Sequence, residues 1–342
     1  MKAMKKLTFL FMMMALLVVL AACGGAETAE ESDEANTDTE AKGEESTEVK
    51  DVKLVLNWFA KAQHGGVYAA KENGLFEENG LNVTIEPGGP QVSSINMVAS
   101  GKAEFGLAHA DQIVVARNEG IELVAVATAM QGSPQAFMFH KGHGIEDFED
   151  LNGRKVYIQP GITYWEYLKT QYDLSGVEEL AYTGQHVNFI PDEDAVTQSF
   201  LTSEPYFMEL EGVDVETKLI ADAGYDPYNV VLYVTKDYLE ENEETVRAFT
   251  KAFVDGWGLY KDSYEDINKI IQEDNPDIEM EALKFEAESQ SEFVYGMDAA
   301  ENGVGYMTEE RWATLIEQLN DLKLLDEVFD AKEIFSNDYL PE

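Results

Sequence analysis

The chain has 342 residues, with 66 Asp and Glu against 24 Lys and Arg, and its formal net charge is −42. Such an excess of carboxylates argues against nucleic acid and anionic lipid as partners, because both are polyanions that the protein would repel. The chain has a single cysteine, Cys23, so an internal disulfide is excluded.

Residues 1–22 have the composition of a secretory signal peptide. Three lysines among the first six residues precede an apolar run over 7–20, which is too short for a convincing permanent membrane span. The run ends in the letters LAAC, which resemble a bacterial lipobox, and this resemblance implies a lipid on Cys23. The alternative is a plain signal peptide followed by an incidental cysteine.

Residues 23–50 contain Cys23 and then an acidic segment without aromatic residues. Such a segment buries too little apolar surface to offset the entropy lost on ordering, so we expect a disordered acidic tether. Residues 51–342 follow, and they are numerous enough for two lobes, each with its own core.

The first part of this region alternates between strand and helix patterns. Apolar runs predict strands at 52–58, 81–87, 103–110 and 121–129. Helices are predicted at 65–73, at 88–101, where the Gly-Gly-Pro turn at 88–90 opens the helix, and at 111–120. Repeated strand-helix units favour an α/β lobe with a parallel sheet. Ligands of such lobes bind at the loops that follow the strands, next to helix N-termini.

Polar and aromatic residues gather at that predicted edge of the sheet. Trp58 offers a flat face on which a heteroaromatic ring could stack. His64, in a loop flanked by glycines, could donate or accept a hydrogen bond at neutral pH. Ordinary packing is the alternative for both. The sequence therefore predicts half of a ligand site in the first lobe, at an edge that also holds Gly88, Gly89, Gln91, His109 and Asp111.

A second lobe is predicted to begin near Pro134. Its strand at 155–159 turns into a helix whose first residues are Thr163, Tyr164 and Trp165. The free N–H groups of a helix N-terminus favour an acceptor or an anion, so these residues are candidates for the second half of the site. Tyr164 and Trp165 are also consistent with core packing.

Glu204 and Tyr206 are the other site candidates of the second lobe. The carboxylate of Glu204 could bind an exocyclic amine of a heteroaromatic ligand. In a chain with this many carboxylates, an ordinary surface position is the alternative for Glu204.

The chain is then predicted to cross back at 225–239 and to enter a helix with an apolar stripe. The spacing of the stripe is typical of core packing. We therefore predict lobe 1 from 51–133 and 238–342 and lobe 2 from 134–237, with a ligand cleft between lobes joined by two crossing strands. The stripe consists of Val246, Phe249, Phe253, Trp257 and Tyr260.

Other chemistry is not supported by the sequence. His140 and His143 stand three residues apart, but without a nearby cysteine or third ligand they do not form a zinc pattern. The glycines at 65–66 lack the Gly-Lys-Ser/Thr ending of a phosphate loop, and no Gly-x-Ser-x-Gly elbow occurs. We therefore expect no metal, no cofactor and no catalytic residue.

Four stretches carry a resemblance to a known family: LNWFAKAQHGGVYAAKENGLFEENGLNV, VASGKAEFGLAHADQIVVAR, EDLNGRKVYIQPG and YNVVLYVTKDYLEENEETVRAF. They resemble the thiamine-precursor-binding family, which includes bacterial lipoproteins that deliver formylaminopyrimidine to ABC importers and related fungal enzymes that make the thiamine pyrimidine. The match runs in order over most of residues 52–262. It implies a two-lobe, type II periplasmic-binding-protein-like fold of the α/β class. It also implies a permease and an ATPase as partners, and we expect a monomer anchored by its lipid on the extracytoplasmic face of the cell membrane.

The same resemblance implies that Trp58 lies in a pyrimidine site, with His64 beside it. His64 matches the histidine that the fungal synthases consume as a substrate, but the cysteine-rich segment of those enzymes is absent here. A lipid-anchored chain with one cysteine therefore resembles the transport branch. Three alternatives stay open: a receptor for another solute such as a sulfonate or riboflavin, a synthase-like enzyme that uses His64, and a surface-anchored protein without a transported ligand.

Overall fold

The computed structural model of the chain describes residues 49–89 and 91–341. The predicted signal segment, Cys23 and nearly all of the predicted tether lie outside the described residues. Within the described ranges, none of the helices combines the length and the hydropathy that a bilayer crossing needs.

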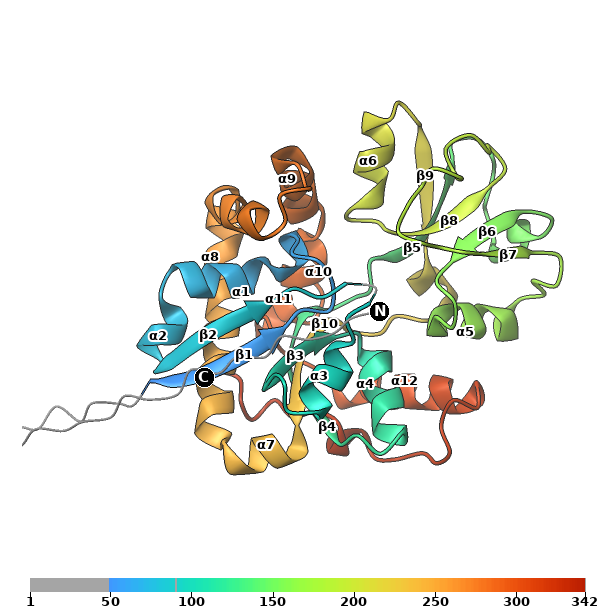
Figure 1. Cartoon of the computed structure of the whole chain (residues 1–342). Helices are drawn as coiled ribbons and strands as arrows, with labels where there is room; N and C mark the ends of the chain where they lie inside the picture. Colours follow the sequence, from blue (N-terminus) through green and yellow to red (C-terminus); the bar gives the residue numbers. More distant parts are fainter. Residues whose placement is uncertain (1–48, 90, 342) are drawn as a thin grey trace, which may run out of the picture. The chain divides into compact units, whose positions relative to one another are not determined.

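The first sheet is built from strands β1 (Lys50–Val55), β2 (Leu81–Glu86), β3 (Phe105–Ala108), β4 (Leu123–Met130) and β10 (Asn229–Thr235). Its strand order is β2-β1-β3-β10-β4 (Figure 1). β1 runs parallel to β2 and β3, whereas β10 runs antiparallel to β3 and β4. The sheet is therefore mixed, and its one late strand is inserted between two early ones.

The second sheet repeats this arrangement with strands β5 (Gln135–His140), β6 (Lys155–Ile158), β7 (Glu178–Ala181), β8 (Val196–Phe200) and β9 (Val215–Leu219). Its order is β7-β6-β8-β5-β9, with β6 parallel to β7 and β8 and with β5 antiparallel to β8 and β9. In each sheet the fourth strand in the order is the antiparallel one, and the chain contributes it on crossing from the other sheet.

The two crossings lie side by side. β4 ends at Met130 and β5 begins at Gln135, and on the return β9 ends at Leu219 and β10 begins at Asn229. Met130 pairs with Asn229 in the first sheet, and Ala136 pairs with Leu219 in the second. The sequence analysis predicted that the second lobe extends to residue 237. This is wrong for β10 (Asn229–Thr235), which is a strand of the first sheet.

Helices connect the strands, and the predicted strand-helix alternation is confirmed. The helix predicted to open at 88–90 does not begin at Gly88 or Gly89, because the cap that begins α3 is Ser93, whose Oγ accepts the N–H of Asn96 at 3.2 Å. The helices of the first lobe are α1 (Gly65–Glu72), α2 (Leu75–Glu78), α3 (Ser94–Ala99), α4 (Ala110–Asn118), α7 (Lys236–Glu241), α8 (Glu243–Asp274), α9 (Met280–Ser289), α10 (Ser291–Tyr295), α11 (Ala299–Asn302) and α12 (Glu309–Asp321). Those of the second lobe are α5 (Thr163–Gln171) and α6 (Glu204–Leu210), and short 3-10 helices are η1 (Ala62–His64), η2 (Phe148–Leu151), η3 (Ile220–Ala223) and η4 (Ala331–Glu333).

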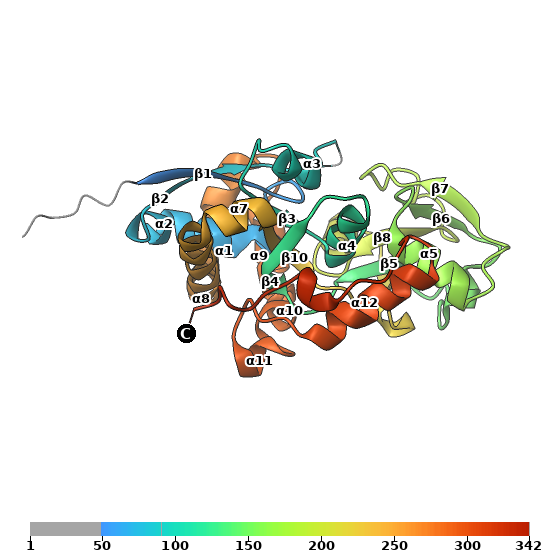
Figure 2. The same ribbon diagram turned by 90° about the horizontal axis from the view of Figure 1, so that it is seen from below.

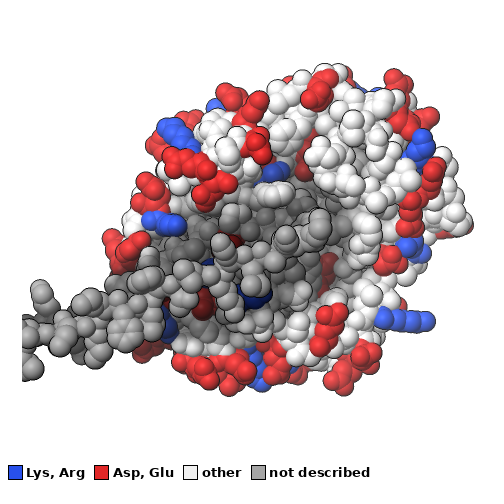
Figure 3. Space-filling view, viewed as in Figure 1, with Lys and Arg blue, Asp and Glu red and all other residues white. Residues whose placement is uncertain are grey.

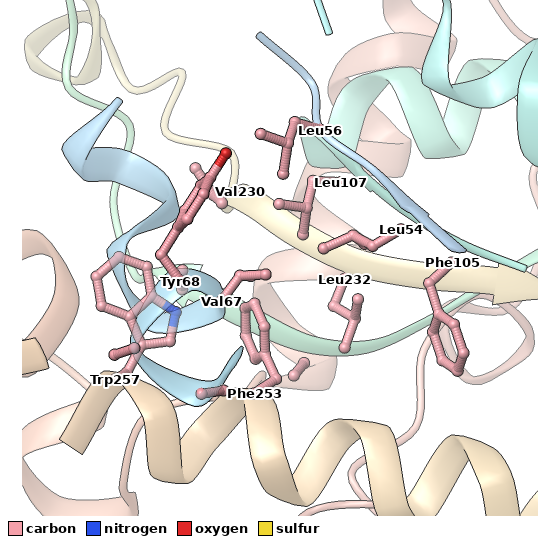
Figure 4. Close-up of a cluster of buried hydrophobic side chains, with 14 of the residues drawn as sticks. Leu54, Leu56, Val67, Tyr68, Phe105, Leu107, Val230, Leu232, Phe253 and Trp257 are labelled. Atoms are coloured by element: carbon pink, nitrogen blue, oxygen red, sulfur yellow. The ribbon is translucent and has the colours of Figure 1, made fainter. Parts of the chain in front are cut away.

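The first sheet has an apolar core on each face, as the alternation along β10 shows. Val230 and Leu232 belong to the cluster under α1 and α8 (Figure 4), whereas Val231 and Tyr233 belong to the cluster on the other face, together with residues of α4 and α12 (Figure 2). This follows from the period of two in a strand, which points neighbouring side chains to opposite faces. The apolar stripe of α8 that the sequence predicted as packing is buried, which confirms that interpretation.

Helices α1 and α8 approach each other closely through glycines. A Cβ added to Gly256 would lie 2.1 Å from the carbonyl oxygen of Gly66, and one added to Gly66 would lie 2.4 Å from Cγ of Trp257. Both distances are below any real Cβ contact, so only glycine permits this approach. The close packing places α1, and the loop that precedes it, firmly against the long helix.

Replacing Gly256 by Ala should lower the free energy of unfolding by about 1–3 kcal/mol, because the new Cβ overpacks against backbone that cannot rotate away. Gly258 is the matched control on the same helix, since nothing lies within 4 Å of a Cβ added there. Gly258→Ala should leave stability unchanged or raise it by up to about 1 kcal/mol. Urea unfolding followed by circular dichroism measures both, and equal stability of the two variants would contradict the close approach of α1 and α8.

Candidate functional site

A cavity of about 630 Å³ lies among residues of both lobes. Its wall includes residues one or two positions after the ends of β1, β3, β6 and β8, as expected for α/β lobes. From the predicted site of the first lobe, Trp58, Gly89, Gln91 and Asp111 line it. From that of the second lobe, Thr163, Tyr164 and Glu204 line it.

Trp58 is half-buried in the loop after β1. Its ring packs edge to face against Phe59, with centroids 5.6 Å apart, and its carbonyl oxygen accepts the N–H of Gly88 at 3.0 Å. A Cβ on Gly88 would lie 2.2 Å from the carbonyl oxygen of Leu56, so a glycine is required where these two loops meet. Gly88 thereby holds the Trp58 loop in place at the cavity wall without lining the cavity itself.

His64 does not reach the cavity wall, which corrects the expectation that it faces a ligand. It is wholly buried at the end of η1, where Nε2 donates to Oδ1 of Asn57 at 2.8 Å and Nδ1 accepts the N–H of Lys61 at 3.4 Å. Burial, and secondarily the charge of Lys61, lowers the pKa of His64 to about 3, so the ring is neutral. His64 therefore supports Asn57, which does line the cavity.

Trp165 is also not a wall residue. It is 3% exposed, and its ring stands perpendicular to that of Phe137 in the core, with centroids 5.8 Å apart. Consecutive residues on a helix point about 100° apart. For this reason Thr163 and Tyr164 of α5 line the cavity while Trp165, one step further, is turned into the core.

Tyr206 lies outside the cavity and joins the two lobes instead. Its ring stacks on Phe285 of α9, with centroids 5.3 Å apart and planes inclined by 27°. Tyr206 is on α6 of the second lobe and α9 belongs to the first, so this pair is a contact between lobes.

Amide and hydroxyl groups form much of the second lobe's wall. Oε1 of Gln198 accepts the N–H of Gln159 at 2.5 Å and the hydroxyl of Tyr164 at 3.4 Å. Glu204 uses Oε2 to accept the N–H of Phe200 at 2.6 Å, which ties this carboxylate to its own loop. The wall therefore presents hydrogen-bonding groups that are already oriented by their neighbours.

One cation lies in the cavity wall, and it is paired. Lys61 is the sole Lys or Arg among the described lining residues, and its Nζ lies 3.2 Å from Glu286 Oε1. Ser203 of the second lobe bridges the pair, accepting from Lys61 at 2.8 Å and donating to Glu286 at 2.6 Å. Burial lowers the pKa of Lys61, but the carboxylates of Glu286 and Glu204 outweigh it, so the pKa lies above its usual value.

The remaining charges of the wall are negative. Asp111 accepts the hydroxyl of Tyr225 at 2.9 Å and the N–H of Gln112 at 2.8 Å. Glu119 and Glu204 also line the cavity. On the outer surface, Asp and Glu side chains are spread over the rim of the visible face (Figure 3), so this rim shares the acidic character of the cavity.

Comparison with known proteins assigns the chain to a family. The model of the family described as NMT1/THI5 like matches residues 61–264. The chain belongs to this family. The resemblance that the sequence motifs indicated is thereby confirmed.

Three bacterial proteins are among the named relatives of the NMT1/THI5-like chain. A formylaminopyrimidine-binding protein of Halalkalibacterium halodurans is 25% identical over 84% of this chain and 89% of the relative. A riboflavin-binding protein, RibY, of Chloroflexus aurantiacus is 23% identical over 99% of both chains. A 4-amino-5-hydroxymethyl-2-methylpyrimidine phosphate synthase of Legionella pneumophila is 20% identical over 85% of this chain and 92% of the relative.

A solved structure shows the fold of this family member. The periplasmic aliphatic sulphonate binding protein SsuA from Escherichia coli matches with a TM-score of 0.64 and 14% identity, over 83% of this chain and 91% of that chain. At this identity the likeness shows the fold alone. The predicted α/β, two-lobe periplasmic-binding-protein-like fold is confirmed.

Several wall residues were missed by the sequence analysis. Asn57 and Lys61 lie in the same loop as Trp58, and Gln159 directly follows β6, so the strand-end rule applied to every polar residue would have found them. Glu286 and Gln290 come from the end of α9, far along the chain, and no local pattern marks them.

The buried state of His64 predicts a measurable pH dependence. Between pH 6.5 and about 3 the unfolded chain protonates this residue and the folded chain does not, so stability falls on acidification by up to about 1.4 kcal/mol per pH unit. From pH 7 to pH 5, the parent should lose roughly 1–2 kcal/mol more unfolding free energy than His64→Gln. Urea titrations at both pH values measure this difference, and an equal loss in the two proteins would mean that His64 titrates normally in the folded state.

Proposed function

We propose that this protein is an extracytoplasmic solute-binding protein that delivers a small, uncharged heteroaromatic to an ABC importer. The proposed ligand is a pyrimidine precursor of thiamine, and the proposed partners are the permease and ATPase of the importer. The relative from Halalkalibacterium halodurans, whose name states formylaminopyrimidine binding, supports this ligand class. A lipid on Cys23 would hold the protein at the extracytoplasmic face of the membrane.

The observation that carries the proposal is the composition of the cavity wall. A half-buried indole, that of Trp58, stands among amide and hydroxyl groups from both lobes. The volume of about 630 Å³ is within the usual range for small-molecule sites. A flat polar heterocycle matches such a wall, because its faces stack on an aromatic ring and its edge atoms hydrogen-bond to amides.

The charges of the wall argue against an anionic ligand. A sulfonate or nitrate is best held by unpaired cationic or N–H donors. Lys61 is already paired with Glu286 and bridged by Ser203, and the other charged wall residues are carboxylates. An anion in this cavity would therefore meet repulsion with little compensation, so the likeness to sulfonate receptors supports the fold and not their ligand.

The geometry also gives little support to a synthase-like reaction. His64 lies behind Asn57 with both ring nitrogens engaged, so a reactant in the cavity does not face it. Cys23 is the single cysteine of the chain and precedes the globular region in sequence. Transport is therefore the function that the wall supports better.

Calorimetric titration tests the ligand. The parent should bind formylaminopyrimidine, and Trp58→Ala should weaken this binding by about tenfold to a hundredfold, because it removes a stacking face. Trp58→Phe keeps a flat ring and is the matched control, with a smaller loss expected. Hydroxymethylpyrimidine, riboflavin and taurine are the competing ligands, and binding of taurine alone would overturn the pyrimidine assignment.

Contacts between the lobes support closure around a ligand. Tyr206 stacks on Phe285, and Ser203 bridges Lys61 and Glu286 across the cleft. Tyr206 and Phe285 lie outside the cavity wall, so they act on the ligand only through the position of the lobes. They stabilise the closed form without contacting what it encloses.

Phe285→Ala should therefore release bound formylaminopyrimidine about two- to tenfold faster, since an aromatic pair contributes about 0.5–1.5 kcal/mol. The association rate should stay nearly constant, as is usual when contacts of a closed complex are lost. Stopped-flow fluorescence measures both rates, with Lys284→Ala on an exposed position of the same helix as control. A slower association with unchanged release would contradict a role in holding the closed form.

A further inference from the structure

His109 lines the cavity at a position where its ring can contact a ligand directly. It follows β3 and immediately precedes α4, and its backbone N–H donates to Oε1 of Gln112 at 3.1 Å. Its ring makes an edge-to-face contact with that of Phe200 of the second lobe, with centroids 6.1 Å apart and planes at 77°. A ligand between the lobes therefore passes close to this imidazole.

One ring nitrogen of His109 is occupied by a residue of the crossing segment. Nδ1 lies 3.0 Å from Nδ2 of Asn229, the first residue of β10. The orientation of this amide is set, because Oδ1 of Asn229 accepts the N–H of Val230 at 3.0 Å. Nδ2 is thus the donor, Nδ1 of His109 is the acceptor, and the proton of the neutral ring belongs on Nε2.

Asn229 is itself held firmly in place. It is wholly buried, and its carbonyl oxygen accepts the hydroxyl of Thr128 on β4 at 3.1 Å. Val230, directly after it, has a φ of +52°, a strained value for a β-branched residue. Strain of this kind persists only where the surroundings impose it. The strained residue is the one whose N–H binds Oδ1 of Asn229.

We infer that His109 donates a hydrogen bond from Nε2 to an acceptor atom of the ligand, and that Asn229 is the positioning residue that selects this donor. This rests on the proposed function and deepens it by naming the chemistry of the ligand atom. The atom carries an unprotonated lone pair, as a pyrimidine ring nitrogen or a formyl oxygen does. A ligand that offers only N–H groups or a cation at this point is rejected, because it would meet the N–H of His109.

The neutral state of the ring agrees with this arrangement. Burial lowers the pKa of His109, and the neighbouring carboxylate of Asp111 offsets that effect only in part. The imidazole therefore remains uncharged at neutral pH, with one donor and one acceptor nitrogen.

The tautomer can be measured without any ligand. Two-bond ¹H–¹⁵N correlation spectra of the ¹⁵N-labelled protein, with His109 assigned by its absence in His109→Gln, should show Nδ1 as unprotonated and Nε2 as protonated. Asn229→Asp replaces the donor by an acceptor and should move the proton to Nδ1 or protonate both nitrogens. Asn229→Ala removes the donor and should give a mixture of tautomers, and this variant replaces the Asp variant if the latter does not fold. A proton on Nδ1 in the parent overturns the inference.

Binding of formylaminopyrimidine to His109 variants is the second test of the inference. A glutamine amide reaches about as far as Nε2 of histidine and an asparagine amide does not, so His109→Gln should keep affinity within about threefold while His109→Asn loses about tenfold. Equal losses in both variants overturn the donor role, with melting curves confirming that both are folded. If the parent does not bind the pyrimidine, the proposed function fails, and the spectrum of the free protein still decides the state of His109.

Discussion

The structure depends on the way in which the chain crosses between its two sheets. Each crossing ends in a strand that is inserted antiparallel into the receiving sheet, β5 in the second and β10 in the first. Each lobe is therefore completed by a segment that comes directly from the other. Because Met130 pairs with Asn229, and Ala136 with Leu219, the crossings are held side by side, and the loops that follow the other strands converge on one cavity.

The same constraint explains why residues of the crossing take part in the site. Asn229 and Ser133 belong to the crossing segments and lie within 3.5 Å of each other. Asp226, in the return crossing, accepts the N–H of Ser133 at 2.7 Å and pairs with Arg311 of α12 at 3.2 Å. The segment that joins the lobes is thus hydrogen-bonded both to itself and to the last long helix of the chain. Through Asn229 and His109 it is also connected to the cavity wall.

The cavity wall shares its acidic charges with the rim around it, but it is lined mainly by uncharged groups. The surface is acidic, and screening by salt weakens interactions between exposed charges. Among the wall residues that the structure describes, Lys61 is the one Lys or Arg, and its charge is balanced by Glu286 and by a hydroxyl from the opposite lobe. What the wall offers to a guest is mainly amides, hydroxyls and an indole, groups that recognise shape and hydrogen-bond pattern more than net charge.

The sequence by itself determined the α/β class, the strand-helix alternation and the loops that form the cavity, because period-two and helical apolar patterns are local properties of the chain. It located Trp58 and Asp111 at the wall through the rule that ligands meet the ends of parallel strands. It located Tyr164 there through the free N–H groups of a helix N-terminus, and Glu204 through the ability of a carboxylate to bind an amine. Only the tertiary structure decided which neighbour of a wall residue turns away. Tyr164 and Asn57 line the cavity, whereas Trp165 and His64 in the same segments are buried away from it. The direction of each side chain is set by packing against residues distant in sequence. For the same reason Glu286 and Gln290 carry no local signal, since they reach the wall only because α9 folds back against η1, where the Gln290 amide binds the carbonyl oxygen of Ala62.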